Sequence, residues 1–372
     1  IERRGILDRR PRRRLPAAMR VSHSEERCTS LLPKRSPTNC IVQGIHGACR
    51  GNLPTLPALE RAPESFMVKK AEKIWLDGEL VPWGEANVHV LTHTLHYGLG
   101  AFEGIRCYRR ADGSSHVFRL GDHTRRLFES ARIMGLEIPF SPEVVNEACR
   151  ETLRANGQHE AYLRPLVFLG DGAMGLYAID NPVRLAIITW EWGSYLGEEA
   201  LEQGIRAKIS SFTRNHPNSL LSKGKISGHY VNSILAKREA MAGGYQEAIM
   251  LDHQGLISEG SGQNLFIIRD GVVKTPSYSS SILGGITRDC VLRILEDEGI
   301  PVIHTSFARD ELYLADEVFC VGTAAEVTPI REIDDRKIGN GRRGEITSRV
   351  QSTYFDIVRG SNERYLEWCD FI

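Results

Sequence analysis

Apolar and polar residues alternate with strand and helix periods along the chain from about residue 67 onward. An alternating stretch around the dipeptide Asp77-Gly78 predicts a hairpin over residues 74–83, because Asp-Gly favours a tight primed turn. Helices are predicted over residues 122–134 and 142–155, and strands over residues 161–169 and 183–190. We expect these elements to form a small α+β domain over residues 67–190.

The second half of the chain repeats this mixture on a larger scale. Residues 191–203, rich in glycine and glutamate, predict an interdomain loop. Strands are predicted over residues 205–212, 247–252, 265–269 and 318–321, and helices over residues 229–242, 286–298 and 346–359. Residues 204–372 are therefore expected to form a larger, barrel-like α/β domain, with a ligand site between the two domains.

The first 66 residues have a different character. Eight of the first twenty residues are arginine, and the segment up to Ser65 is broken by prolines without strand or helix periodicity. This pattern predicts a disordered basic extension. Our favoured explanation is that translation begins at Met67. A transit peptide is the rival, although acidic residues such as Glu2 and Asp8 count against it, and an RNA-binding arm is a third possibility.

Composition narrows the functional class. The 372 residues have a zero formal net charge and an apolar fraction of 41%, which is ordinary for a globular enzyme and gives no sign of a nucleic-acid or membrane partner. No apolar run approaches the roughly 18 residues of a membrane span. The eight cysteines form no C-x-x-C pair, so we expect no metal site, a reducing compartment and a cytoplasmic location.

Lys225 is the candidate reactive residue. It precedes Gly228 and Tyr230 in the pattern K-x-x-G-x-Y, at the junction of an irregular loop and a predicted helix that ends at Gly243. A lysine at such a junction can be partly desolvated and poised for Schiff-base chemistry with a carbonyl. Lys223, two residues earlier, is the competitor.

A candidate phosphate site follows in the segment ISEGSGQNLFIIRDGVVKTPSYSSSILGGITRD. Gly284 and Gly285 allow a tight turn before the predicted helix that starts at Ile286. A helix N-terminus of this kind offers unpaired N–H groups to a phosphate. Glu259, upstream in the same segment, adds a carboxylate. A surface turn before an amphipathic helix would explain the glycines alone, but not their combination with Glu259 and a reactive lysine.

The chain resembles the pyridoxal-phosphate (PLP) aminotransferases of fold type IV, and in particular the branched-chain amino-acid aminotransferases. The resemblance rests on K-x-x-G-x-Y, E-G-x-G-x-N-L-F, L-x-G-I-T-R-D, GTAAEVTP and the AYLRP strand, and extends from about Lys73 to Tyr365. It implies a two-domain α+β fold and transfer of the amino group from leucine, isoleucine or valine to 2-oxoglutarate. The products would be branched-chain 2-oxo acids and L-glutamate, formed by a Schiff-base, ping-pong mechanism.

The resemblance also implies roles for individual residues. Lys225 would bond to the cofactor and move the substrate proton, Glu259 would pair with the pyridine nitrogen, and Tyr230 would bond to the ring oxygen. The remaining cofactor contacts implied are Arg126, Leu283, Gly285, Ile286, Thr287 and Thr323. Gly284 departs from the pattern, since many relatives have proline there, and we expect a somewhat more flexible loop.

On the substrate side, Tyr162 and Arg164 would leave the same face of a strand. An inward arginine is costly without an anion. The resemblance makes that anion the distal carboxylate of glutamate, and a neighbouring acidic side chain is the alternative. The resemblance further implies that Tyr97, Phe102, Trp192 and Tyr195 line the apolar pocket and that Thr323, Ala324 and Ala325 bind the α-carboxylate.

Two other functional readings stay open. One is a D-amino-acid aminotransferase or an aminodeoxychorismate lyase of the same fold. The other is a non-catalytic cofactor carrier, or a protein that acts chiefly through its basic arm. The Tyr162–Arg164 pair and the GTAA turn argue against the first, and intact Lys225 and Glu259 argue against the second. The resemblance implies a homodimer or a dimer-based hexamer, in which one copy completes the pocket of another.

Overall fold

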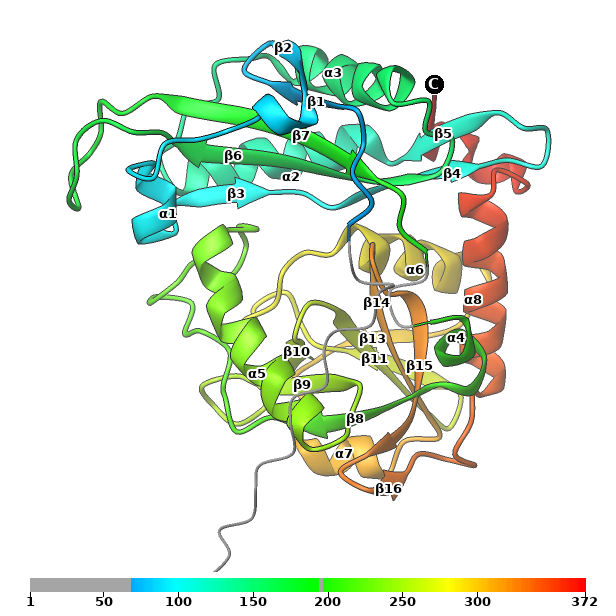
Figure 1. Ribbon diagram of the computed structural model, residues 1–372. Coiled ribbons are helices and arrows are strands. Elements are labelled where there is room, and N and C mark those ends of the chain that lie inside the picture. Colours follow the sequence, from blue (N-terminus) through cyan, green and yellow to red (C-terminus); the bar gives the residue numbers. More distant parts are fainter. Residues whose placement is uncertain (1–67, 194–196) are drawn as a thin grey trace, which may run out of the picture. The chain divides into compact units, whose positions relative to one another are not determined.

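Two β-sheets and the helices that cover them make up the described part of the chain (Figure 1). The computed structural model describes residues 68–193 and 197–372. The predicted basic extension of residues 1–66 and the candidate residue Tyr195 lie outside the described residues. Within that part, no helix is long and apolar enough to cross a membrane.

The first sheet is antiparallel throughout and runs in the order β17-β5-β4-β6-β7-β1-β2, with β3 also paired to β6. Its strands are β1 (Lys73–Leu76), β2 (Glu79–Pro82), β3 (Gly100–Phe102), β4 (Ile105–Arg109), β5 (Ser115–Phe118), β6 (Ala161–Leu169), β7 (Val183–Trp190) and β17 (Cys369–Phe371). Two helices, α2 (Leu120–Ile133) and α3 (Pro142–Ala155), bury Leu127 and Val145 against Leu163 and Ile187 of the sheet. Ser141 caps α3 by accepting from the Val144 N–H.

The second sheet follows the order β10-β9-β8-β15-β14-β11-β12-β13, with β16 paired to β15. Its strands are β8 (Ile205–Ile209), β9 (Glu247–Leu251), β10 (Ile257–Gly260), β11 (Asn264–Arg269), β12 (Val272–Thr275), β13 (Val302–His304), β14 (Glu317–Gly322), β15 (Glu326–Ile333) and β16 (Arg336–Lys337). Three pairs are parallel, β8 with β9, β8 with β15 and β12 with β13. Helices α6 (Ile286–Asp297) and α8 (Glu345–Val358) pack Ile294 and Tyr354 against Phe266. These helices lie beside the second sheet in Figure 1.

The predicted elements are largely confirmed. Ile74 pairs with Val81, and the turn between β1 and β2 has positive φ at both Asp77 (51°) and Gly78 (107°), as a primed turn requires. The predicted helices correspond to α2, α3, α5 (Tyr230–Ala242), α6 and α8, within two residues at each end. The mixed architecture of two sheets with covering helices agrees with the predicted fold class.

Three expectations need correction. Residues 191–203 are not all loop, because α4 (Glu198–Gln203) forms there and contacts β15. The strand predicted to reach residue 212 ends at Ile209, where the Ser210 hydroxyl and the Ser211 N–H donate to the Glu239 carboxylate. Residues 369–371 fall within the predicted large domain, yet β17 joins the first sheet.

In helix α5 the large apolar side chains are exposed and the small side chains are buried. Val231, Ile234 and Met241, whose spacing helped to predict this helix, are between 47% and 61% exposed. The buried face consists of Ser233, Ala236 and Ala240. The small buried side chains let α5 approach β9 closely, and the large apolar ones remain on the surface.

Candidate active site

A cavity of about 480 Å³ is lined by residues from both sheets and from the segments between them. Most of the predicted site residues line it, namely Phe102, Arg126, Tyr162, Arg164, Trp192, Lys225, Tyr230, Glu259, Leu283, Gly285, Ile286, Thr287, Thr323 and Ala324. Their segments are far apart in the sequence, so the fold brings the predicted motifs together. Tyr97 and Ala325 do not line the cavity.

Lys225 lies in an extended segment that borders the first sheet. The Phe102 N–H donates to its carbonyl (3.1 Å), and its own N–H donates to Ser130 Oγ (2.9 Å). Its Nζ donates to the Tyr230 hydroxyl at 2.7 Å. Lys225 is thus held at both its backbone and its amine, with the amine turned toward the cavity.

Close packing of two backbone segments explains why position 228, in the motif K-x-x-G-x-Y, is glycine. A Cβ on Gly228 would lie 3.1 Å from the Gly98 carbonyl oxygen, to which the Gly228 N–H donates at 3.0 Å. The two backbones touch, so Gly228 is needed for packing rather than for an unusual φ. This contact fixes the start of α5 and with it the position of Tyr230.

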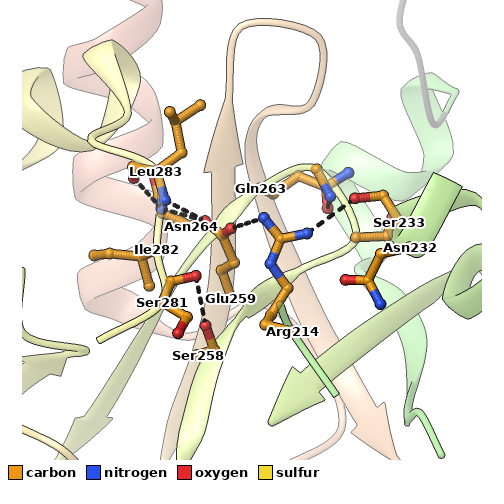
Figure 2. Close-up of polar contacts among 12 residues, drawn as sticks. Arg214, Asn232, Ser233, Ser258, Glu259, Gln263, Asn264, Ser281, Ile282 and Leu283 are labelled. Carbon is orange, nitrogen blue, oxygen red and sulfur yellow. Dashed lines mark hydrogen bonds and ion pairs between the residues drawn. The ribbon is translucent and has the colours of Figure 1, made fainter. Parts of the chain in front are cut away.

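Figure 2 shows the buried carboxylate of Glu259 bound from two sides. Arg214 Nη2 lies 2.7 Å from Oε1, while the Asn264 side-chain amide and the Leu283 N–H each donate to Oε2 at 3.1 Å. Burial raises the pKa of Glu259, and Arg214 opposes that rise. Arg214 and Asn264 were not singled out from the sequence, although Asn264 belongs to a motif that was.

Gly285 is the N-cap residue of helix α6, which begins at Ile286 as predicted. A Cβ on this residue would lie 2.0 Å from Asn264 Oδ1, so the position tolerates no side chain without a shift. The first N–H groups of a helix have no partner within the helix. Ile286 and Thr287 line the cavity at this end of α6, which fits the predicted anion site.

Arg126 faces the same end of α6 from helix α2. Its Nε and Nη2 donate to the two carboxylate oxygens of Glu103 (2.7 and 2.8 Å), and its Nη1 donates to the Gly284 carbonyl (2.9 Å). These bonds use three of the five guanidinium N–H groups. The bidentate pair with Glu103 fixes the plane of the guanidinium.

Glu103 is a residue that the sequence analysis missed. It is fully buried, and its Oε2 also lies 2.7 Å from His123 Nδ1. Burial favours the neutral acid, but Arg126 and His123 outweigh it and hold the pKa of Glu103 well below its ordinary value. A charged residue inside the apolar run LGAFEGIRCY was the signal that could have found it, because a buried charge needs a partner.

Arg164 lies among aromatic rings. Its guanidinium carbon is 4.6 Å from the centre of the Phe102 ring, 5.5 Å from that of Tyr162 and 5.6 Å from that of Trp190. Among the described residues Arg164 makes no ion pair, and its buried Nε has no hydrogen-bond acceptor. This environment disagrees with the alternative that Arg164 pairs with a neighbouring acidic side chain.

The Gly322–Ala325 turn is fixed by another missed residue, Arg106. Its guanidinium donates to the carbonyls of Thr323 (2.9 Å) and Ala324 (3.2 Å) and, at 3.2 Å, to that of Gly193. Because a peptide group is planar, fixing each carbonyl also fixes the N–H of the next residue on the opposite side. The turn can therefore present oriented N–H groups to an anion.

Two predicted substrate residues have other surroundings in this chain. Tyr97 ends the short helix α1 (His93–Tyr97), where it is 45% exposed and packs on His93. Ala325 is buried, and its carbonyl accepts a hydrogen bond from the Thr328 hydroxyl. Nothing within a single copy of the described chain brings Tyr97 to the cavity.

Comparison with known proteins agrees with this geometry. The family model described as "Amino-transferase class IV" matches residues 100–333. A branched-chain-amino-acid aminotransferase of Pseudomonas aeruginosa is 52% identical over 295 residues, covering 79% of this chain and 95% of that protein.

Solved structures give the same result. The branched-chain amino acid aminotransferase of Escherichia coli superposes with a TM-score of 0.78 at 46% identity, covering 81% of this chain and 99% of that one. The T.th. branched-chain amino acid aminotransferase complexed with N-(5'-phosphopyridoxyl)-L-glutamate gives a TM-score of 0.77 at 44% identity over the same shares. The family match, the identities and the shared fold together show that this chain belongs to the class IV aminotransferases.

Proposed function

We propose that this chain transfers the amino group of leucine, isoleucine or valine to 2-oxoglutarate, with PLP as its cofactor. The observation that carries the proposal is the cavity in which the amine of Lys225, the carboxylate of Glu259 and the start of α6 lie together. The names of the relatives favour this activity over a D-amino-acid aminotransferase or a lyase of the same fold.

The residues present fit PLP. Arg126 and the N-terminal residues of α6 would hold the phosphate, Glu259 would hold the proton on the pyridine nitrogen, and Tyr230 would bond to the ring oxygen. When bound, the cofactor supplies an electron-accepting ring that stabilises negative charge on the substrate α-carbon. Asn264 and the Leu283 N–H support this fit, because they orient the Glu259 carboxylate.

Lys225 would serve as the proton carrier. Its amine would move a proton between the α-carbon of the substrate and the carbonyl carbon of the cofactor. The hydrogen bond from Nζ to the Tyr230 hydroxyl orients the amine before substrate binds. Ser130, which accepts from the Lys225 N–H, holds the backbone beneath it.

One pocket would accept both kinds of amino donor. The rings of Phe102, Tyr162 and Trp192 offer an apolar surface to a branched side chain, and Arg164 lies among these rings with capacity for a carboxylate. The turn held by Arg106 would bind the α-carboxylate that both donors share. The two substrates thus differ at the distal end, where Arg164 lies.

A panel of amino donors with 2-oxoglutarate as acceptor tests the activity. We expect turnover with L-leucine, L-isoleucine and L-valine and a visible absorption band of bound cofactor. The corresponding D-amino acids are the matched control. Turnover of D-alanine with no turnover of L-leucine would contradict the proposal.

We further propose a homodimer, formed through an apolar patch that comprises residues 90–97 and 174–179. Leu176, Tyr177 and Val90 in this patch are 94%, 82% and 73% exposed. His93 Nε2 lies 2.8 Å from the Gly175 carbonyl, so the two segments are contiguous. A second copy on this patch would also bring the exposed Tyr97 toward a cavity that it does not reach within one copy.

Sedimentation velocity tests the assembly. The substitution Leu176→Asp should shift the protein toward the monomer, whereas Leu314→Asp, an exposed leucine on another element, should not. A wild-type protein that sediments as a monomer would contradict the dimer.

A cytoplasmic location stays part of the proposal, supported by the free, buried thiols of Cys107, Cys149, Cys290, Cys320 and Cys369.

A further inference from the structure

The segment of residues 276–285 leads into α6. Side chains from other parts of the chain bind its carbonyl groups at residue 278 and at residues 280–284. We call this segment the phosphate loop. Lys223 Nζ donates to the carbonyls of Tyr278, Ser280 and Ile282. The Ser258 hydroxyl donates to the carbonyl of Ser281, and the Asn264 side chain donates to that of Leu283. Arg126 donates to the carbonyl of Gly284. Ser258, Asn264 and the loop residues from 281 to 283 are drawn in Figure 2.

Lys223 contributes half of these six bonds. Its Nζ lies 2.9 Å from the Ile282 carbonyl and 3.2 Å from that of Ser280, and it also contacts the Tyr278 carbonyl. An ammonium group has three N–H donors and no acceptor, so three carbonyls match it fully. The amine that competed with Lys225 in the sequence is therefore engaged by the loop and does not line the cavity.

The same ammonium group also orders the side chain of Tyr278. Nζ lies 4.2 Å from the centre of the Tyr278 ring, a cation–π distance. The Tyr278 hydroxyl in turn lies over Gly284, where a Cβ would be 2.5 Å from it. Glycine in place of the proline of many relatives is thus explained by packing, because a side chain at 284 would displace Tyr278.

We propose that Lys223 is a positioning residue that holds the phosphate loop in the shape that binds the phosphate of the cofactor. Only Gly224 separates Lys223 from Lys225, so one short segment joins the reactive amine to the phosphate loop. The same loop presents the Leu283 N–H to Glu259 and the Gly284 carbonyl to Arg126. Lys223 thereby helps to position Glu259 and Arg126, although it does not itself line the cavity. The inference rests on the proposed function.

Cofactor binding to the apoenzyme of Lys223→Met tests this role. Methionine preserves much of the apolar stem but cannot donate a hydrogen bond. Charge-assisted hydrogen bonds lost at the loop should raise the Kd for PLP about tenfold or more. The kcat at saturating PLP should stay within about threefold of wild type, because Lys225, Tyr230 and Glu259 are unchanged.

A matched control is Lys208→Met on β8. Lys208 also lies over a tyrosine ring, with Nζ 5.5 Å from the centre of Tyr245, but it does not line the cavity. We expect its Kd for PLP to equal that of wild type. Inorganic phosphate binding to each apoenzyme provides a second readout, and it should weaken in Lys223→Met alone.

The outcomes separate this inference from the proposed function. If the wild-type protein binds no PLP, the proposed function is wrong. If wild type binds PLP and Lys223→Met binds it equally well, the role of Lys223 is wrong. The role is also wrong if kcat at saturating PLP falls more than tenfold while the Kd is unchanged. If Lys223→Met does not fold, Lys223→Gln, which keeps one donor group, should show an intermediate rise in Kd, and an unchanged Kd would again overturn the role.

Discussion

Replacing Arg164 with methionine should separate the two substrates of the proposed reaction. Methionine keeps an apolar stem against the Phe102 ring but removes the guanidinium, which has no ionic partner among the described residues. Leucine, isoleucine and valine have no distal charge. Glutamate and 2-oxoglutarate each have a second carboxylate, which would be the missing anionic partner of Arg164.

The size of the effect follows from the contact that is lost. A hydrogen bond to a charged group contributes about 1.5–3 kcal/mol, which corresponds to roughly 10- to 150-fold in affinity. The buried Nε of Arg164 has no acceptor, so a bound carboxylate also satisfies a polar group that is otherwise unpaired. We therefore expect the glutamate reaction to weaken by at least about tenfold and the leucine reaction to change by less than about threefold.

Each half-reaction can be followed alone by the change in cofactor absorbance after mixing with a single amino donor. The control variant is Arg184→Met on β7, since Arg184 also lies over a ring, 5.3 Å from the centre of Phe168, but pairs with Asp77 at 2.7 Å. It should leave the ratio of the two rates unchanged. Equal slowing of the leucine and glutamate reactions by Arg164→Met would refute the assigned role.

Three further predictions concern the cofactor site. Lys225→Ala should abolish turnover and the cofactor link that borohydride fixes, and peptide mapping that located this link on Lys223 would contradict the assignment. Gly285→Ala should weaken PLP binding about tenfold or more in an equilibrium titration, because the added Cβ meets Asn264 Oδ1 at 2.0 Å. Glu103→Gln should lower the free energy of unfolding at neutral pH, and the difference from wild type, measured by urea unfolding, should shrink as the pH falls below about 4.5. The sign follows because the folded protein holds the pKa of Glu103 well below its ordinary value of 4.5, so the charge of Glu103 stabilises the fold above about pH 4.5 and this stabilisation is lost in acid. A difference between the variant and wild type that grew in acid would show that Glu103 is neutral in the fold.

Local signals in the sequence predicted the turns and contacts that form between residues close together in the chain. Asp77 and Gly78 specify their own turn, and the spacing from Lys225 to Tyr230 brings the phenol to the amine across one turn of backbone. Most of the site residues predicted from the family resemblance line the cavity. These signals are short in range or strongly patterned, so a single sequence contains them.

Residues that act through distant partners could not be found in this way. Arg106 binds a turn that begins more than two hundred positions later in the chain, and Arg214 meets Glu259 from a separate segment of the chain. Neither contact leaves a periodic pattern in the sequence. The apolar spacing of α5 predicted a helix but not which face is buried, because its small residues pack inward. In the proposed homodimer the role of Tyr97 depends on a second copy, about which one chain carries no direct signal.

The pairing of β17 with β5 has a consequence for how the protein is made. During synthesis the ribosome completes β5 long before residues 369–371 emerge, so until then the growing chain exposes one edge of its first sheet. An exposed strand edge is a template for pairing with another chain. A deletion that removes only Cys369–Phe371 leaves every cavity residue in place and still opens that edge. Low yield of a chain that lacks these three residues would therefore reflect aggregation of nascent protein.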